Sequence, residues 1–185
     1  LNHLGHYGKF WNGWTPDEHL GSRIWNKGGL ENYPPVIARG VLLDIAGLYG
    51  VEMLEDGYEV SAEDCQKAAK EQGVEFQKGD VVCVNMGRMN AWPDFDGYLL
   101  NTPGIGLGAA KFLCEEAGAM CIAGDTIGLE VIPMKEPNSF LPVHAYMFAT
   151  AGAQIMEIVD FREIAAEKQY EFAFLGFPMK LRGAT

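Results

Sequence analysis

A histidine and a carboxylate in an apolar part of the chain are the residues best suited to chemistry. His144 opens a helix-like segment, and Glu157 lies in the strand-like segment QIMEIV at residues 154–159. A buried carboxylate without a partner is costly, so Glu157 needs a reason to be there. An imidazole and a carboxylate suit a zinc, manganese or iron ion. The alternative is a core histidine hydrogen-bonded to a core glutamate, and both interpretations stay open.

A second group of candidates lies in the first fourteen residues, LNHLGHYGKFWNGW. His3 and His6 are three residues apart, which is a weak metal signal, and a pair on a surface loop is the alternative. The aromatic side chains around and after them suit the wall of a pocket for a flat organic substrate. Equally, they suit simple packing of the loop. The substrate-binding candidates are therefore His6, Tyr7, Phe10, Trp11 and Trp14.

Other acidic residues give weaker signals. Asp125 ends an apolar strand, with Glu130 five residues later. Sites in α/β proteins gather at the carboxyl ends of strands, but a capping role in the following turn is the favoured interpretation of Asp125. Asp94 and Asp96 indicate a solvated turn, and His19 is expected to be exposed.

The glycine-rich segment GIGLGA at residues 104–109 matches Gly-x-Gly-x-x-Ala. A dinucleotide site needs this turn to follow a buried strand directly. Here Asn-Thr-Pro at residues 101–103 intervenes. We therefore expect the glycine-rich segment to form the first turn of a helix that packs closely on a neighbouring element. The chain carries neither a Gly-x-Ser-x-Gly elbow nor a Walker loop, and its cysteines have no flanking features of a nucleophile. Hydrolysis by metal-activated water is the most economical enzymatic interpretation.

Composition limits the class of protein. The 185 residues suffice for one compact domain, and the net charge of −11 disfavours a nucleic acid or an anionic membrane as partner. No apolar run reaches the length of a membrane-spanning helix. The four cysteines read as free, mostly buried thiols, which favours a reducing compartment such as the cytoplasm.

Hydrophobic periodicity and the positions of capping and turn residues predict alternating strands and helices, which indicates an α/β or mixed domain. Residues 1–35 read as a long ordered loop and residues 88–100 as an irregular stretch. The expected strands cover residues 36–45, 80–86, 119–123, 154–159 and 171–177. The expected helices cover residues 61–72, 102–118, 142–151 and 160–168.

The order of several short motifs resembles one known family over nearly the whole chain. They are ARGVLLD at 38–44, KGDVV at 78–82 leading to MGR at 86–88, PGI at 103–105, AGDT at 123–126 and the block from His144 to Glu157. In order and spacing they resemble the cyclase family, which includes bacterial kynurenine formamidase and isatin hydrolase. Asn12-Gly13 after the aromatic run resembles a branch of larger members.

The resemblance implies a swivelling β/β/α domain, a mixed α/β fold, assembled as dimers or tetramers. It also implies a hydrolase of amide-like C–N bonds that uses zinc or manganese and a small-molecule substrate. The family's metal motif reads His-x-x-x-His-x-Asp-x-Pro-x-His, and His3 resembles its last histidine, a general acid/base. His144 and Glu157 resemble the later histidine and glutamate ligands.

The chain departs from this pattern at its start. The first two histidines and the aspartate of the motif would lie before residue 1. We therefore expect a single cyclase-like domain over residues 1–185 that lacks the N-terminal metal-motif segment and the C-terminal end. The alternative function is a non-catalytic binding or assembly protein on the same fold.

Overall fold

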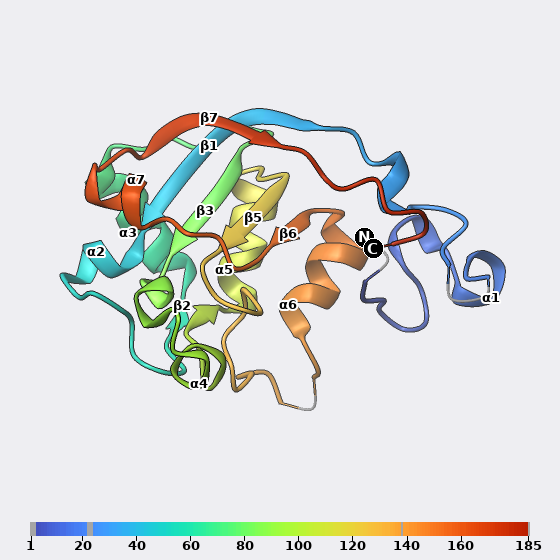
Figure 1. Ribbon diagram of the computed structural model, residues 1–185, viewed down its shortest axis with the longest axis horizontal. Helices are drawn as coiled ribbons and strands as arrows, with labels where there is room; N and C mark the ends of the chain where they lie inside the picture. Colours follow the sequence, from blue (N-terminus) through green and yellow to red (C-terminus); the bar gives the residue numbers. More distant parts are fainter. Residues whose placement is uncertain (1–2, 22–23, 138, 185) are drawn as a thin grey trace.

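A five-stranded sheet forms the centre of the computed structural model, which describes residues 3–21, 24–137 and 139–184 (Figure 1). Its strands run in the order β6-β5-β3-β1-β7. β7 pairs antiparallel with β1, and the other neighbouring pairs are parallel. The predicted mixed α/β fold is confirmed. The strands are β1 (Val36–Asp44), β3 (Val81–Asn85), β5 (Cys121–Gly124), β6 (Gln154–Met156) and β7 (Glu171–Gly176).

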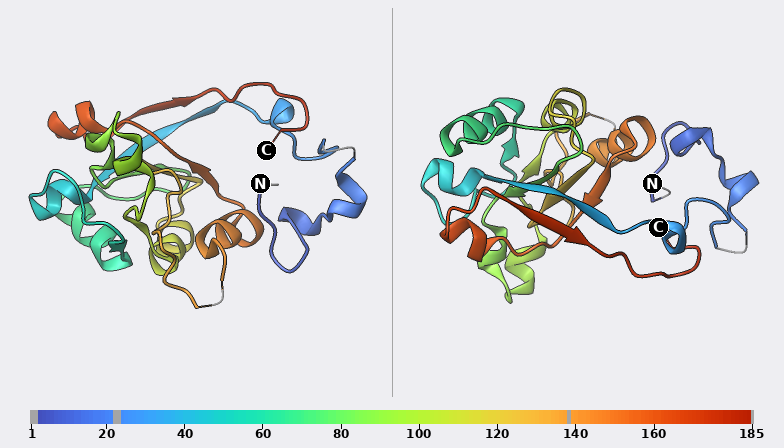
Figure 2. Two further views of the ribbon diagram at one scale, coloured as in Figure 1. Left: turned by 60° about the horizontal axis from the view of Figure 1, so that its bottom comes forward. Right: turned by 90° about the horizontal axis from the view of Figure 1, so that it is seen from above.

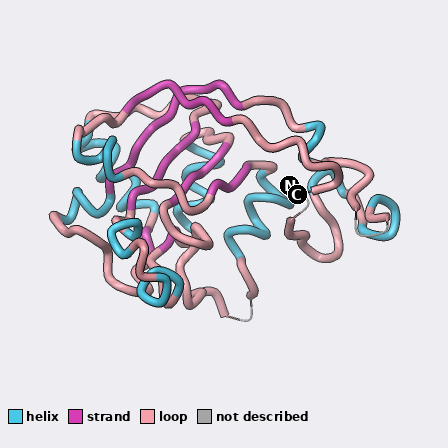
Figure 3. The backbone as a smooth tube through the Cα atoms, viewed as in Figure 1, coloured by secondary structure: helices cyan, strands magenta, loops and turns pink. Residues whose placement is uncertain are grey.

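Helices cover both faces of the sheet (Figure 3). One face carries α2 (Ile45–Tyr49), α3 (Ala62–Gln72), α5 (Leu107–Lys111) and α6 (Pro142–Ala145), and the other carries α7 (Arg162–Ala166). Two helices continue as single wider turns, Phe112–Glu116 after α5 and Tyr146–Ala151 after α6. None of the described helices is long and apolar enough to cross a membrane.

The strands are apolar on both sides because both faces are covered. Val82, Val84 and Ile122 point into the larger core under α3, α5 and α6. Cys83 and Ala123 alternate with them and point into the smaller core under α7. All four cysteines are free, as predicted, and three of them are buried.

Two segments far apart in the sequence form an arch beyond the sheet (Figures 1 and 2). The arch consists of residues 28–36, which lead into β1, and residues 174–184, which leave β7. The Leu30 N–H donates to the Ala184 carbonyl over 2.9 Å, and the Gly183 N–H donates to Glu31 Oε2 over 2.7 Å. These bonds join the segment that precedes β1 to the end of the described chain.

The described part of the N-terminal loop, residues 3–21 and 24–35, contains short helical turns and packed aromatic rings. It contains η1 (Trp11–Gly13), α1 (Pro16–His19) and η2 (Leu30–Asn32). The ring of Phe10 meets that of Trp25 at 4.8 Å between ring centres, and the ring of Trp11 lies against Gly152, which follows the wider turn after α6. The irregular stretch at 88–100 forms two short helical turns, η3 (Arg88–Ala91) and α4 (Phe95–Leu99).

Two predicted boundaries were wrong. The helix expected from residue 102 begins at Leu107, because Gly104–Ile105 forms β4, which pairs with β2 (Glu59–Val60). The strand expected over 154–159 ends at Met156, because Ile158 adopts a left-handed conformation with φ 58°. Glu157 therefore lies at the end of β6 and not inside it.

Candidate functional site

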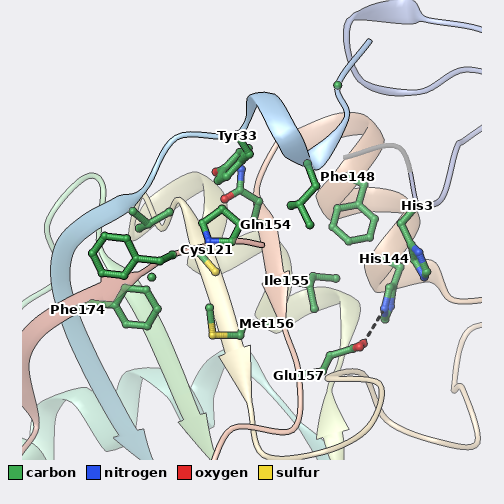
Figure 4. A pocket seen from close by; sticks show the side chains of 16 residues that line it. His3, Tyr33, Cys121, His144, Phe148, Gln154, Ile155, Met156, Glu157 and Phe174 are labelled. Carbon is green, nitrogen blue, oxygen red and sulfur yellow. Dashed lines mark hydrogen bonds and ion pairs between the residues drawn. The ribbon is translucent and has the colours of Figure 1, made fainter. Parts of the chain in front are cut away.

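Three polar side chains, those of Glu130, His144 and Glu157, meet at the end of β6, and His144 is the central one. Figure 4 shows its contact with Glu157. Its Nδ1 lies 2.5 Å from Glu130 Oε1, and its Nε2 lies 3.1 Å from Glu157 Oε1. Because a carboxylate only accepts, Glu130 makes Nδ1 a donor. The imidazole is thereby oriented with Nε2 toward Glu157.

The side chain of Glu130 is positioned between β4 and the start of α6. Glu130 bridges to Ile105 of β4 and faces the first turn of α6. There Glu130 accepts backbone N–H groups from Val143 over 3.3 Å and from His144 over 3.2 Å. These N–H groups have no partner inside the helix, so the carboxylate satisfies them and holds the imidazole at the same time.

The pKa of His144 reflects this environment. Burial alone would lower the pKa, since it disfavours the imidazolium. The hydrogen bonds and negative charges of Glu130 and Glu157 outweigh burial and raise the pKa to about 9. In the metal-free protein at neutral pH the ring is an imidazolium held between two carboxylates.

The backbone beside these three residues is strained. Leu129 precedes Glu130 with φ 53°, Leu141 caps α6 with φ 48°, and Ile158 follows Glu157 with φ 58°. A bulky residue in the left-handed region costs on the order of 1 kcal/mol or more and persists only where the surroundings demand it. Such strain is typical of functional sites.

A cavity of about 430 Å³ opens beside the pair of His144 and Glu157. It lies between the arch and the outermost strand, β6 (Figure 4). Its polar end is formed by His3, His144 and Glu157, and the side chains of Tyr33 and Gln154 lie at another end. The remaining walls are largely apolar, from Leu30, Val36, Cys121, Phe148, Ile155, Met156, Phe174, Phe177 and Pro178.

His3 belongs to this cavity. Its ring centre is 6.3 Å from that of His144 and 6.1 Å from that of Phe148. The structure thus brings together all three residues for which the sequence predicts a catalytic or metal-binding role. Their roles stay predictions.

The five predicted substrate-binding residues do not line the cavity. His6 stacks on Tyr7 at 4.2 Å, and Tyr7 is 93% exposed. Phe10 and Trp11 pack the loop, and Trp14 meets His19 at 5.8 Å between ring centres. His19 is therefore partly covered and not exposed as expected. A role for these five in substrate binding stays a prediction that the walls of the cavity do not support.

Glu130 is the residue that the sequence interpretation missed. It is 1% exposed, whereas the Glu157 side chain is 35% exposed. The carboxylate whose burial requires a partner is thus that of Glu130, whereas the sequence analysis expected it to be that of Glu157. Glu130 stands in the apolar run IGLEVI at 127–132, so the same signal was present there.

Asp125 does not cap its own turn. It is fully buried and accepts backbone N–H groups from Met86 over 3.0 Å and from Met89 over 3.4 Å. Burial raises its pKa to about 6, against the opposing effect of these N–H donors. Asp125 therefore holds the turn after β3. Asp94 and Asp96 are exposed at α4, as predicted.

The pair of His144 and Glu157 fits two neighbouring ligands of one metal ion. At metal–ligand distances of about 2.0–2.2 Å, adjacent donor atoms lie roughly 3.0–3.5 Å apart. The observed Nε2···Oε1 distance is 3.1 Å. Among the described residues, however, no three His, Cys, Asp or Glu side chains form a group that could hold a metal. The metal-binding role of this pair therefore stays a prediction.

Gly104, in the glycine-rich segment, packs directly against the backbone of Glu130. A Cβ on Gly104 would overlap the backbone of Glu130 and Val131, whereas a Cβ on Gly108 in α5 would meet nothing within 4 Å. Gly104→Ala is expected to lower the free energy of unfolding by about 1–3 kcal/mol, because the overlap displaces Glu130. Gly108→Ala, the matched control, is expected to raise it by about 0.5–1 kcal/mol. Urea unfolding measures both, and equal effects would contradict this role for Gly104.

Known proteins share this fold. A model of the family described as "Putative cyclase" matches residues 4–131. A crystal structure described as a novel cyclase is similar at 27% identity and a TM-score of 0.86, over 98% of this chain and 61% of that one. Isatin hydrolase A from Labrenzia aggregata, bound to benzyl benzoate, is similar at 18% identity and a TM-score of 0.68, over 85% and 61%.

A protein from Bacillus stearothermophilus described as a "predicted metal-dependent hydrolase" is similar at 17% identity and a TM-score of 0.50, over 80% of this chain and 59% of that one. A search of curated proteins found no match. The chain spans less than two thirds of the length of these three solved structures.

Proposed function

The chain belongs to the cyclase family, and from this premise we propose that it is a hydrolase that cleaves the C–N bond of a small amide. The observation that carries the proposal is the arrangement of Glu130, His144 and Glu157 at one end of a cavity of about 430 Å³. That volume suits a small molecule. The family match and the hydrolases among the similar structures support the same reaction class.

We propose that His144 Nε2 and Glu157 would bind a divalent metal, manganese or zinc. Such an ion lowers the pKa of a bound water and polarises a carbonyl group. Glu130 holds Nδ1, so Nε2 is the ring nitrogen that would bind the ion. Carboxylate partners of this kind orient histidine ligands and raise their basicity. The further ligands are not among the described side chains.

His3 is proposed as the proton donor. Hydrolysis adds the oxygen of water to the carbonyl carbon, breaks the C–N bond and leaves a nitrogen that needs a proton. His3 lies in the cavity wall beside His144, and an imidazole is the side chain that most often serves as a general acid. The apolar walls would hold the rest of the substrate out of water.

The test combines metal analysis with turnover. We expect the desalted protein, supplied with manganese or zinc, to hydrolyse members of a panel of formanilides and bicyclic lactams. His3→Ala is expected to lower kcat by at least about 10²-fold, as for loss of a general acid. His19→Ala is the control, since His19 packs on Trp14 away from the cavity. An unchanged rate in His3→Ala would remove this residue from the mechanism.

One observation favours the second candidate, a binding or assembly protein on the same fold. The described residues form no group of three metal-ligating side chains. A protein that binds no manganese or zinc after reconstitution, and hydrolyses no amide, yet still binds small molecules in the cavity, would support this alternative.

Self-association is the remaining expectation from the family. The arch and the adjoining strands expose several large apolar side chains, which is common at interfaces between subunits. We propose a dimer or tetramer on this basis. The side chains are those of Ile37, Leu175, Phe177, Met179 and Leu181.

A further inference from the structure

Phe148 contacts both histidines of the cavity. Its ring centre lies 6.1 Å from that of His3 and 5.7 Å from that of His144, with the ring planes at 80° and 79°. Nearly perpendicular aromatic rings at such distances attract each other, because the positive edge of one ring meets the negative face of the other. Phe148 is 7% exposed and lines the cavity. The phenyl ring therefore lies against the two imidazoles in the cavity wall (Figure 4).

The wider turn after α6 brings Phe148 to this position. Phe148 follows His144 by four residues, so the two side chains lie on the same face of the helix. Single wider turns of this kind are frequent at functional sites. The N-terminal loop packs on the same turn, because the ring of Trp11 lies against Gly152. The loop that carries His3 thus meets this part of the helix at two points.

The two histidines differ in how their rings are held. His144 is buried, and its ring nitrogens contact Glu130 and Glu157. His3 is exposed, and among the described residues no group hydrogen-bonds to its ring. An exposed side chain that nothing holds changes its rotamer within nanoseconds. The position of the His3 ring beside His144 therefore depends on its ring contacts, and Phe148 makes one of them.

We propose that Phe148 is a positioning residue, which holds the His3 imidazole beside His144 in the cavity wall. The inference rests on the proposed function, in which His3 gives a proton to the leaving nitrogen. A proton donor must lie within hydrogen-bond reach of the atom that it protonates, and a small displacement slows the transfer. The alternative is that Phe148 is only an apolar part of the wall. It would then act on the substrate directly and not through His3.

The first test is a double-mutant cycle on kcat. Phe148→Leu removes the ring and keeps an apolar side chain, and it is expected to lower kcat about three- to tenfold, the effect of one aromatic pair. In the His3→Ala protein the same substitution is expected to leave kcat unchanged, because the residue through which Phe148 acts is gone. Met147→Leu is the matched control, since the neighbouring Met147 is fully buried in the larger core. An equal loss of kcat with and without His3 would overturn the inference.

The second test needs no turnover. An aromatic ring shifts the NMR signals of hydrogen atoms near it, so the ring hydrogens of His3 report on Phe148. In the metal-free protein with labelled histidines, Phe148→Leu is expected to move the His3 signals toward their position in an unstructured peptide. The signals of His19, which packs on Trp14, are expected to stay in place. His3→Ala identifies the His3 signals. Unmoved His3 signals in a folded Phe148→Leu protein would overturn the inference.

If Phe148→Leu does not fold, the unchanged protein decides. A nuclear Overhauser effect between the ring hydrogens of His3 and Phe148 supports the inference, and its absence refutes it.

The two tests also separate this inference from the proposed function. If the His3 signals move as expected but the protein hydrolyses no amide, the proposed function fails and Phe148 still positions His3. If His3→Ala slows amide hydrolysis but a folded Phe148→Leu protein keeps its full kcat, the proposed function stands. Phe148 is then only part of the cavity wall.

Discussion

His144→Asn is expected to lower kcat/KM for amide hydrolysis by at least about 10- to 100-fold, because loss of a residue that merely supports a metal ligand already has an effect of this size, and His144 is proposed as a ligand itself. The asparagine amide can still donate to Glu130 from a position near that of Nδ1. Nothing then replaces Nε2, the atom that lies 3.1 Å from Glu157. The same substitution is expected to weaken binding of manganese or zinc, which metal analysis measures independently of turnover.

Tyr146→Phe is the matched control for His144→Asn. Tyr146 lies two residues further along the same helix, and its hydroxyl donates to Glu115 over 2.7 Å, away from the cavity. Loss of that bond should affect stability and leave the catalytic rate unchanged. A His144→Asn protein that is folded and hydrolyses amides at the original rate would show that His144 is a structural residue of the core.

The second large effect is a loss of stability of the metal-free protein as the pH rises. The pKa of His144 is about 9 in the folded state, above its ordinary value of 6.5. A raised histidine pKa contributes stability that is fully present below pH 6.5 and is lost as the pH rises through 9. The contribution is about 3 kcal/mol. Urea unfolding in the presence of a chelator, from pH 6 to pH 9, measures it.

Glu130→Gln tests the cause of this pH dependence. Glutamine keeps the shape and one acceptor oxygen but removes the charge that stabilises the imidazolium. The free energy of unfolding of Glu130→Gln should change much less between pH 6.5 and pH 9 than that of the unchanged protein. Above pH 9 the buried thiols, whose pKa values burial raises, add their own loss. If the free energy of unfolding falls equally with pH in the two proteins below pH 9, Glu130 is excluded as the cause of the pH dependence.

Local signals predicted the regular elements well. Ser61 and Asp64 form the capping box that begins α3, and Gly73 ends it in a left-handed conformation. β3 is β-branched and lies inside the predicted strand at 80–86. Such features depend on residues within one turn or one strand, so the sequence shows them directly.

Long-range contacts decided the boundaries that were predicted wrongly. Gly104–Ile105 has helix-compatible neighbours, yet it extends because β2 and the segment at Glu130 hydrogen-bond it from two sides. β6 stops before Ile158, which takes a left-handed conformation and donates its N–H to the Thr126 carbonyl. None of these partners is near in sequence to the segment that it holds.

The sequence by itself determined the mixed α/β fold, the family and the candidate residues His3, His144 and Glu157, because these depend on residue type, periodicity and order along the chain. Only the tertiary structure identified Glu130 as the partner of His144 and showed that β6 and the arch line one cavity. Both depend on distances between segments that irregular loops connect. The hydrogen bonds and the burial of these groups exist only once the sheet, α6 and the arch have come together.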